Sequence, residues 1–525
     1  MKKILFSQKD PSHNFTPDVI DAIAEIKNGG TIFFECGEYH FYDQGSHEGF
    51  FAPSNNETGM KKVVFPILDC SDITIDGSGS TFVFHGTVSP FIVKGSKNVT
   101  IKNATFTTYL PSYALMRVIE KTDEKFVCKF DETKIPCKVC NGNLVFNTET
   151  ESISTIPKKL SFHALDRLLI RYLFTKDCVA SKENLATTYV FCEAIEKDGL
   201  VEFHYIDDGR AEKCVYEVGD LVSINLEESR FRDVFFLEDS ENTIISAINV
   251  KRGGGMGIIA QLCKDIEIDR FIVTPTEGEN ITLTADIIHI INCSGKLSIH
   301  DCEMRSSLDD ACNVHGTYTS VTAVGKNHVD LRYNHEAHSS LELYKKGDLL
   351  TVINNKNLDE VCKFRVASAS FTDEQGLDIR IYTEDPTDDI KENFLVESPL
   401  RMPDVHIYRN KCENIPHWRL SGAGDIIVED NEFADCNIPI YAFDLAEYWY
   451  ESGRIKNLVI RNNHFKKAHF SEGFIKTGVS GFYGDDAPVI HKTITISGNI
   501  FEDMIQDPFD IKGFENVIIK DNIIK

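Results

Sequence analysis

A short strand signature recurs along this chain and constrains its fold more than any other feature. Each copy has two apolar residues separated by one residue, a turn residue three positions later and a large apolar residue five positions after the pair. Period-2 alternation that is rich in β-branched residues predicts short strands. A unit that returns at about 20 to 50 residues without helices in between predicts an all-β, parallel β-helix with one coil per unit. The apolar pairs are Ile73/Ile75, Val99/Ile101, Ile266/Ile268, Leu297/Ile299, Ile426/Val428, Leu458/Ile460, Ile494/Ile496 and Val517/Ile519.

Asparagine fills the turn position in four of these units. Asparagine tolerates the left-handed backbone conformation, and its side-chain amide can bond to its counterpart in the next coil. We therefore expect left-handed turns and a ladder of amides at Asn431, Asn463, Asn499 and Asn522. The large apolar position is occupied by Phe106, Val273, Met304, Phe433, Phe465, Phe501 and Ile524.

A helical pattern precedes the first predicted coil. Thr16 followed by Pro17 is typical of an N-cap and the first helical position. A short helix is expected at about residues 17 to 28, where it would cover the open apolar end of the solenoid. Its apolar stripe is Val19, Ile20, Ile23 and Ile26.

The repeat is interrupted twice, and each interruption contains alternating strands. The two segments close with similar phrases, Gly219–Asn225 and Gly347–Asn354, and we interpret them as two related small β domains inserted into loops. Because the second begins just after His315, it is expected to stand beside the site discussed below. The predicted segments are the cap and first coils (1–112), the first inserted domain (113–228), middle coils (229–315), the second inserted domain (316–400) and C-terminal coils (401–525).

The charge of the chain disfavours several partners. Fifty-five Lys and Arg against 81 Asp and Glu give a net charge of −26, so nucleic acid and anionic membranes are not expected partners, and strongly anionic substrates are disfavoured. The basic start is followed by an apolar run of three residues, too short for a signal peptide, and no stretch approaches a membrane span. We therefore expect a cytoplasmic protein. Its oligomeric state stays open, with a homo-oligomer among the alternatives.

Three carboxylates are separated by one predicted coil. Asp286 precedes Asp309 and Asp310 by 23 and 24 residues, so residues 286–290 align with 310–314. Asp286 and Asp310 are then expected on one face of adjacent strands, roughly 4.8 Å apart. Asp309 shares that face only if the chain bends beside it. Carboxylates gathered in this way repel one another, which favours an acid–base site for glycoside hydrolysis over the alternative, an acidic surface turn.

No metal site or cofactor is expected. Cys137 and Cys140 form a C-x-x-C pair, whereas a zinc knuckle needs a second pair at matching spacing. A calcium-dependent lyase would need a catalytic Lys or Arg, and none is clearly placed beside Asp309.

Four motifs taken together resemble those of glycoside hydrolase family 110. The resemblance extends from about residue 240 to the C-terminus. It implies a right-handed parallel β-helix and inverting, exo-acting hydrolysis of terminal α-1,3-linked galactose, as in blood group B-type or linear Galα1-3Gal glycans. The partner would be an oligosaccharide with terminal α-galactose. The motifs are Gly255–Gln261, Ala285–His289, Leu308–Gly316 and Tyr448–Gly453.

The same arrangement of aspartates recurs in the polygalacturonases of family 28, which are also inverting β-helix enzymes. This likeness implies that Asp309 is the general acid and that Asp286 and Asp310 hold and activate the water. Repulsion from its two neighbours would raise the pKa of Asp309, and inversion calls for carboxyl separations of roughly 6.5 to 9.5 Å. The sequence lacks the basic motifs with which polygalacturonases bind an anionic sugar, so a neutral sugar is favoured.

Six further residues are candidates for substrate binding. Trp449 could stack on the apolar face of galactose or serve as packing. His289 and His315 could bond to the aspartates or the substrate, or be structural histidines. Glu451 could accept from sugar hydroxyls or cap a turn, and Arg252 could orient a carboxylate or be an exposed turn residue. Gln261 lies in one of the motifs, and the full set is Arg252, Gln261, His289, His315, Trp449 and Glu451.

Two other functions remain alternatives. One is a different β-helix glycoside hydrolase of polygalacturonase type. The other is a noncatalytic carbohydrate-binding β-helix, in which the acidic groups only form hydrogen bonds with sugars.

Overall fold

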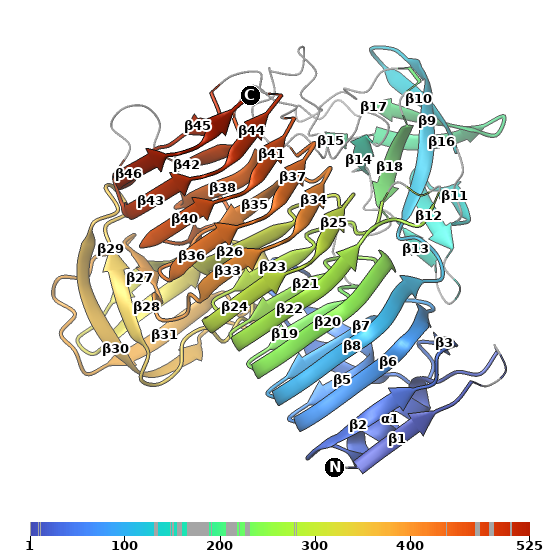
Figure 1. Ribbon diagram of the computed structural model, residues 1–525, viewed down its shortest axis with the longest axis horizontal. Helices are drawn as coiled ribbons and strands as arrows, with labels where there is room; N and C mark the ends of the chain where they lie inside the picture. The colour runs from blue at the N-terminus through green and yellow to red at the C-terminus, as the bar shows by residue number, and fades with distance from the viewer. Residues whose placement is uncertain are drawn as a thin grey trace.

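The main body of the protein is a stack of coils that rises from the N-terminal to the C-terminal end (Figure 1). Each coil contributes parallel strands to three faces, and each strand pairs with its equivalents in the neighbouring coils. The fold is a right-handed parallel β-helix; the strand signature predicts the parallel coils, and the family resemblance implies their right hand. The computed structural model describes the chain apart from residues 1, 9, 11, 131–134, 148, 150–151, 155–159, 165–187, 191, 206–217, 220, 226–231, 278, 280, 437, 468–472, 482–487 and 504–506.

Two of the three faces form one continuous 19-stranded sheet, because four long strands bend from the first face onto the second. The long strands are β6 (Ser71–Phe84), β8 (Lys97–Thr108), β20 (Glu241–Arg252) and β22 (Lys264–Val273). The first face also has β1 (Lys2–Phe6), β2 (Gly30–Phe34), β24 (Ser294–His300), β33 (Asp404–Tyr408), β36 (Asp425–Glu429), β40 (Asn457–Arg461), β43 (His491–Ser497) and β46 (Phe514–Lys520). The second has β3 (Glu38–Phe41), β25 (Glu303–Arg305), β34 (Lys411–Glu413), β37 (Glu432–Ala434), β41 (His464–Lys466), β44 (Ile500–Glu502) and β47 (Ile523–Ile524).

The third face is a separate 12-stranded sheet, and it carries most of the residues discussed below. Its strands are β4 (His47–Phe51), β5 (Gly59–Leu68), β7 (Ser89–Lys94), β19 (Phe235–Glu238), β21 (Ile258–Gln261), β23 (Ile288–Ile291), β26 (Cys312–Thr317), β35 (His417–Leu420), β38 (Ile438–Leu445), β39 (Glu451–Ser452), β42 (Ile475–Ser480) and β45 (Phe509–Asp510). β4 and β39 pair antiparallel with their neighbours.

The apolar pairs of the sequence point into the coil, where they stack on their equivalents. Ile268 pairs with Ile299, which pairs in turn with Ile407, and all three are fully buried. Burying one such side chain stabilises the fold by about 1.5 to 3 kcal/mol. The large apolar position forms a similar stack, in which the rings of Phe433 and Phe465 lie 5.0 Å apart.

The predicted asparagine ladder is confirmed. Asn463 accepts hydrogen bonds from the backbone N–H and the side-chain amide of Asn431, and it donates to Asn499 at 3.0 Å. Asn410, which the pattern did not include, extends the ladder by one coil. The left-handed residues were predicted one position too late, since positive φ belongs to the residue before each ladder position, such as Asn462 (φ 56°).

A short helix covers the N-terminal end of the solenoid core, as predicted. Helix α1 spans Thr16–Glu25 and buries Val19 and Ile23 against the coils. The predicted cap is wrong: Phe15 is the N-cap, and the hydroxyl of Thr16 bonds instead to the backbone of Tyr42. Among the residues that the structure describes, no helix has the length and apolar character needed to cross a bilayer.

Both interruptions of the repeat contain antiparallel strands. The first has a seven-stranded sheet and a three-stranded sheet, and the second forms a closed six-stranded barrel. The strands of the first are β9 (Tyr113–Lys121), β10 (Lys125–Phe130), β11 (Cys137–Cys140), β12 (Asn143–Asn147), β13 (Ser152–Ser154), β14 (Leu160–Ala164), β15 (Thr188–Val190), β16 (Cys192–Lys197), β17 (Leu200–Tyr205) and β18 (Leu221–Asn225). The barrel comprises β27 (Thr319–Val324), β28 (His328–Tyr333), β29 (Leu349–Ile353), β30 (Glu360–Phe371), β31 (Asp378–Thr383) and β32 (Leu395–Glu397), with a 3-10 turn, η2 (Glu336–His338).

The two inserted domains share one local geometry. In each, a glycine with positive φ precedes a strand by two residues, donates its N–H to a partner strand and accepts a bond from an arginine there. The relation between the two domains stays a prediction, since the first contains a seven-stranded and a three-stranded sheet and the second a closed barrel. The bonds join Gly219 to Val118 and Arg117, both at 2.7 Å, and Gly347 to Val366 and Arg365, both at 2.8 Å.

Candidate active site

Asp286 and Asp310 lie in the turns that lead into two neighbouring strands of the third face. The backbone N–H of Gly257 donates to the carbonyl of Asp286 at 2.9 Å, and that of Ile287 donates to the carbonyl of Asp310 at 2.8 Å. These bonds continue the pairing of β21, β23 and β26, in which Ile288 lies opposite Cys312. The predicted alignment of residues 286–290 with 310–314 is therefore confirmed.

The backbone bends at residues 308 and 309. Such a bend was required if Asp309 and Asp310 were to share one face. Asp309 is half-buried, and its carboxylate accepts the backbone N–H of Asp310 at 3.1 Å. The two carboxyls are close enough that the charge of Asp309 raises the pKa of Asp310. All three predicted aspartates thus meet at one edge of the coils.

Asp310 is the most deeply perturbed of the acidic groups at this edge that show a shift. Its side chain is buried, and burial raises its pKa well above the ordinary value; Asp309 and Asp286 raise it further, against the opposing charge of Arg419. His417 Nε2 lies 3.1 Å from one carboxyl oxygen, and Arg419 Nε lies 3.9 Å from the other. Asp310 therefore retains a proton at pH values at which an exposed aspartate is ionised.

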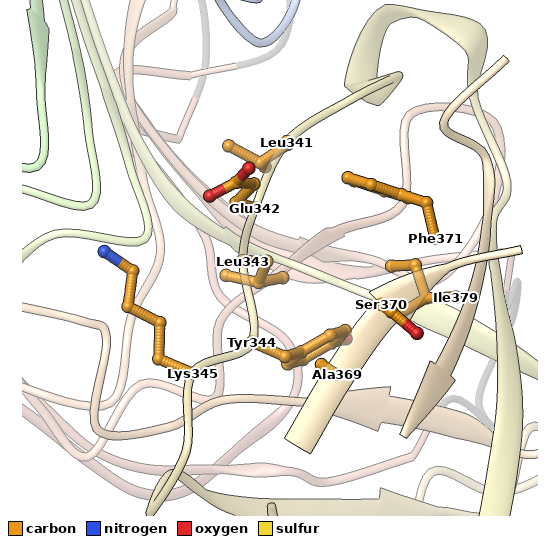
Figure 2. Close-up of a pocket in the computed structure, with 9 residues that line it drawn as sticks. All are labelled: Leu341, Glu342, Leu343, Tyr344, Lys345, Ala369, Ser370, Phe371 and Ile379. Atoms are coloured by element: carbon orange, nitrogen blue, oxygen red, sulfur yellow. The ribbon is translucent and has the colours of Figure 1, made fainter. Parts of the chain in front are cut away.

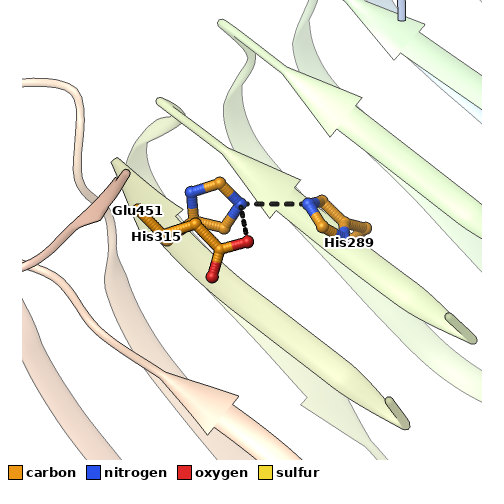
Figure 3. Close-up of side chains that lie close together, drawn as sticks. All are labelled: His289, His315 and Glu451. Carbon is orange, nitrogen blue, oxygen red and sulfur yellow. Dashed lines mark hydrogen bonds and ion pairs between the residues drawn. The ribbon is translucent and has the colours of Figure 1, made fainter. Parts of the chain in front are cut away.

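Two buried histidines connect Asp286 to the next coil. His289 Nδ1 is hydrogen-bonded to the carboxylate of Asp286, and its Nε2 lies 3.0 Å from Nε2 of His315 (Figure 3). His315 Nδ1 donates to the carbonyl of Gly316 at 2.6 Å. Burial lowers the pKa of His315 to about 4. His289 and His315, which were predicted as possible hydrogen-bond partners of the aspartates, thus form a row of hydrogen-bonded side chains with Asp286.

Glu451 closes the other side of this group. One of its oxygens lies 3.6 Å from His315 Nε2 and accepts amide bonds from Asn55 at 3.3 Å and Asn313 at 3.4 Å. The other oxygen lies 3.5 Å from Arg419 Nη2. Although burial opposes ionisation, His315 and Arg419 bring the pKa of Glu451 down to about 2. Glu451 is therefore a buried carboxylate whose charge is balanced by protein groups.

Two clusters of described side chains have the spacing of metal ligands, with ligand atoms within 4.8 Å of one another. The first is His289, His315 and Glu451, and the second is Asp269, His300 and Asp301. In the second, Arg409 already pairs with Asp301 and lowers the pKa of that carboxyl to about 2. The first cluster is considered further below.

Two segments that are far from the three aspartates in sequence lie beside this edge: the segment that contains Ser54 and the barrel turn η2. The backbone N–H of Ser54 donates to Gln261 at 2.8 Å, and the hydroxyl of Ser54 lies 2.7 Å from Nδ1 of His338 in the barrel turn η2. Nε2 of His338 lies 3.2 Å from the carbonyl of Trp449. The ring of His335 lies 4.3 Å from that of Trp449, which is partly exposed. The second inserted domain therefore does stand beside the carboxylates.

A separate cavity of about 210 Å³ lies in the barrel itself (Figure 2). Its lining is polar and apolar in about equal parts, and the amino group of Lys345 at its edge pairs with Asp239 outside the cavity at 2.6 Å. The lining holds none of the three aspartates. The residues around it are Leu341, Glu342, Leu343, Tyr344, Lys345, Ala369, Ser370, Phe371 and Ile379.

Comparison with known proteins identifies relatives over most of the chain. A protein named alpha-1,3-galactosidase A from Shewanella woodyi is 26% identical over 475 residues, which cover 87% of this chain and 74% of the relative. Alpha-1,3-galactosidase B from Phocaeicola vulgatus is 24% identical over 552 residues, covering 98% of this chain and 88% of the relative. The chain is thus similar, over most of its length, to proteins named alpha-1,3-galactosidase. This finding confirms the resemblance carried by the four motifs, although no protein-family model matches the chain.

Among solved structures, the family 28 exopolygalacturonase of Yersinia enterocolitica covers the whole of this chain and 71% of its own, at 12% identity and a TM-score of 0.42. The exopolygalacturonase of Thermotoga maritima covers 99% of this chain and 91% of its own, at 9% identity and a TM-score of 0.34.

Two predicted binding residues have other partners in this protein. Gln261 is fully buried, and its side-chain amide forms hydrogen bonds with Ser54, with the carbonyl of Ala52 and with Glu238. Gln261 therefore holds the segment that contains Ala52 and Ser54 in place. Arg252 forms an ion pair with Glu279 and donates to two backbone carbonyls. The interactions described for Arg252 therefore lie away from the three aspartates.

Sequence reasoning missed four residues of the site, which are Arg419, His417, Asn55 and His338. Arg419 lies opposite Asn313 in the pairing of β35 with β26, in the outward row that also holds His289. Counting coils across the second inserted domain would have found Arg419 and His417. No repeat signal marks Asn55, because it lies in an irregular segment between β4 and β5.

Proposed function

We propose that this protein is a glycoside hydrolase, an inverting exo-glycosidase that removes terminal α-1,3-linked galactose from oligosaccharides. Glycans of blood group B type and linear Galα1-3Gal are the proposed substrates. The names of the curated relatives support the activity and the linkage. The structural observation that carries the proposal is the meeting of Asp286, Asp309 and Asp310 at one edge, with the pKa of Asp310 raised by burial and by its two neighbours.

In the proposed reaction, Asp309 protonates the glycosidic oxygen while Asp286 and Asp310 hold and deprotonate a water on the opposite face of the sugar. The half-buried position of Asp309 suits contact with a leaving group that extends toward solvent. Adjacent carboxyl groups titrate as a coupled pair. The proton that burial and repulsion retain on Asp310 can therefore move to Asp309 when substrate binds, which leaves Asp310 ionised.

Arg419 supports a neutral sugar over an anionic one. Its guanidinium lies 3.5 Å from Glu451 and 3.9 Å from Asp310, so carboxylates of the protein already balance its charge. A uronate would bring another negative charge beside three aspartates, and the net charge of −26 opposes it further. The site is therefore proposed to take galactose rather than galacturonate.

The test incubates the full chain with Galα1-3Gal, the blood group B trisaccharide and polygalacturonate in parallel, and follows released sugars by chromatography. Galactose is expected from the first two substrates, and no product is expected from the third. The variant Asp310→Asn serves as the matched control for contaminating activity. Release of galacturonate would favour the polygalacturonase-like alternative.

Binding without hydrolysis is the outcome that would support the noncatalytic alternative. Calorimetric titration with Galα1-3Gal measures binding directly. If the wild-type chain binds this disaccharide and releases no galactose beyond the level of Asp310→Asn, the proposed activity is wrong.

A further inference from the structure

The hydrogen bonds around His289 fix how many hydrogens the site holds. His315 Nδ1 faces the carbonyl of Gly316, which can only accept, so this nitrogen carries a hydrogen. The contact of 3.0 Å between the two Nε2 atoms needs one hydrogen, because two bare nitrogen lone pairs repel. The contact between His289 Nδ1 and the carboxylate of Asp286 needs another. Three contacts thus require three hydrogens.

Two neutral imidazole rings supply only two of these hydrogens, because each neutral ring has one N–H. The group formed by Asp286, His289 and His315 therefore holds one proton more than two neutral rings and a carboxylate would. Imidazole is ordinarily the stronger base, with a pKa of about 6.5 against about 3.9 for an aspartate. The extra hydrogen is therefore placed on a ring rather than on Asp286.

The surroundings decide between the two rings. Burial, His289 and Arg419 lower the pKa of His315, while Glu451 and the Gly316 carbonyl raise it, and the net value is about 4. His289, in contrast, has a direct bond to a carboxylate. The other titratable groups around these three residues are Asp310 beside Asp286, Glu451 from β39, Arg419 from β35 and, behind Glu451, His338 from η2. These contacts favour His289 as the ring with two hydrogens.

A metal ion could also satisfy two facing lone pairs, and Glu451 would be its third ligand. The charges around Glu451 oppose this alternative. Arg419 lies 3.5 Å from one of its oxygens, and the amides of Asn55 and Asn313 donate to the other. Each oxygen of Glu451 therefore already has a positive or hydrogen-bearing partner. An extra proton on one of the two histidines accounts for the contact between their Nε2 atoms and leaves the partners of Glu451 in place.

We propose that His289 is a positioning residue for Asp286, carrying hydrogens on both ring nitrogens and donating one to Asp286 and one to His315. His315 acts through His289, because the Gly316 carbonyl fixes its Nε2 as an acceptor. This arrangement keeps Asp286 as a carboxylate, oriented to receive a hydrogen from the attacking water. The meaning for catalysis rests on the proposed glycosidase function, whereas the positions of the hydrogens do not.

Neutron crystallography of the full chain at pH 7.5 reads these hydrogens directly. The expected result is deuterium on Nδ1 and Nε2 of His289 and on Nδ1 of His315. One deuterium on each ring, or two on His315, would overturn the proposal, as would a stoichiometric metal ion found between the rings by elemental analysis and anomalous scattering. This measurement is independent of activity, so its failure is distinct from failure of the proposed function.

A pair of variants tests the positioning role in the active enzyme. In His315→Gln an amide oxygen can still accept from His289, whereas His315→Leu offers no acceptor. The acidic limb of the profile of kcat/KM against pH is expected to keep its position in His315→Gln. In His315→Leu it is expected to move up by roughly one pH unit, because His289 would lose its positive charge and the loss of one nearby charge has about this effect. A purely structural role would lower activity without moving the limb. Identical limbs in both variants and the wild type would contradict the proposal.

Discussion

The backbone carbonyl groups of Asp286 and Asp310 hold equivalent positions in successive coils. Each accepts a hydrogen bond from the backbone N–H of the preceding coil, Asp286 from Gly257 and Asp310 from Ile287. The backbone ladder, rather than a loop conformation, therefore sets the spacing of these two carboxylates. A site built on a regular ladder is more rigid than one built on loops. Asp309 is the exception, since its position depends on the bend beside Asp310.

Replacing any of the three aspartates by asparagine is expected to lower kcat on Galα1-3Gal by at least about a hundredfold, because the shape remains while proton transfer is lost. Binding of the disaccharide, measured by calorimetry, should survive. The loss in Asp309→Asn should shrink on a substrate with an activated leaving group, which needs little protonation. Losses in Asp286→Asn and Asp310→Asn should not shrink, and near-normal turnover in any variant would remove that residue from the mechanism.

The product released first is expected to be β-galactose. Single displacement by water on the opposite face inverts the anomeric carbon of an α-linked substrate. Proton NMR during the first minutes of reaction distinguishes the two anomers before mutarotation mixes them. Early α-galactose would show retention and exclude the roles assigned to the aspartates.

Replacing Trp449 by alanine is expected to raise KM roughly tenfold with a smaller change in kcat, because its partly exposed ring offers stacking area rather than proton chemistry. Trp449→Phe retains an aromatic face and serves as the matched control. Its KM should lie close to the wild-type value. If Trp449→Ala leaves KM unchanged, the ring only packs against His335.

Glu397 is expected to make the protein less stable as pH rises. It is fully buried beside Arg454, at 3.5 Å, and burial outweighs that charge to raise its pKa to about 8. The folded state thus keeps a proton that the unfolded chain loses above about pH 4.5, so stability falls between about pH 4.5 and 8 and levels off above that range. Glu397→Gln should flatten this part of a plot of Tm against pH. Parallel curves for the variant and the wild type would contradict the assignment.

The asparagine ladder is expected to dominate the stability of the C-terminal coils. Asn463→Ala removes the acceptor of the Asn431 backbone N–H and of one hydrogen of its side-chain amide, and it removes one donor to the carbonyl of Val428; in a buried position these losses should cost about 3 kcal/mol or more. Asn522→Ala, at the more exposed end of the ladder, should cost less. Urea denaturation of the two variants makes the comparison. Equal losses would show that position in the ladder does not matter.

The coil and its carboxylates could be predicted from the sequence because both follow one period. The 24 residues between Asp286 and Asp310 equal one coil, so local strand patterns were enough to align them. The amide ladder was predictable for the same reason. The left-handed residue was misplaced by one position because several residue types adopt that conformation, among them Arg409 and Asp430.

The walls of the site could not be predicted in this way. Asn55 and His338 reach the site through irregular segments whose contacts depend on tertiary packing. Gln261 was assigned to substrate because a motif contains it, yet its amide is occupied by backbone groups of the wall. A pattern can show that a residue belongs to a site without showing what the residue touches.

The bond between Asn55 and Glu451 joins residues 396 positions apart in the chain. A solenoid otherwise folds locally, because each coil needs only its neighbours. A nascent chain that has emerged from the ribosome up to the end of the barrel could thus have folded most of its coils and still lack this contact. During refolding, recovery of strand signal would report assembly of the coils, whereas recovery of turnover would report arrival of both distant segments. The edge that carries the three aspartates is therefore complete only after Glu451 has been synthesised and has met Asn55.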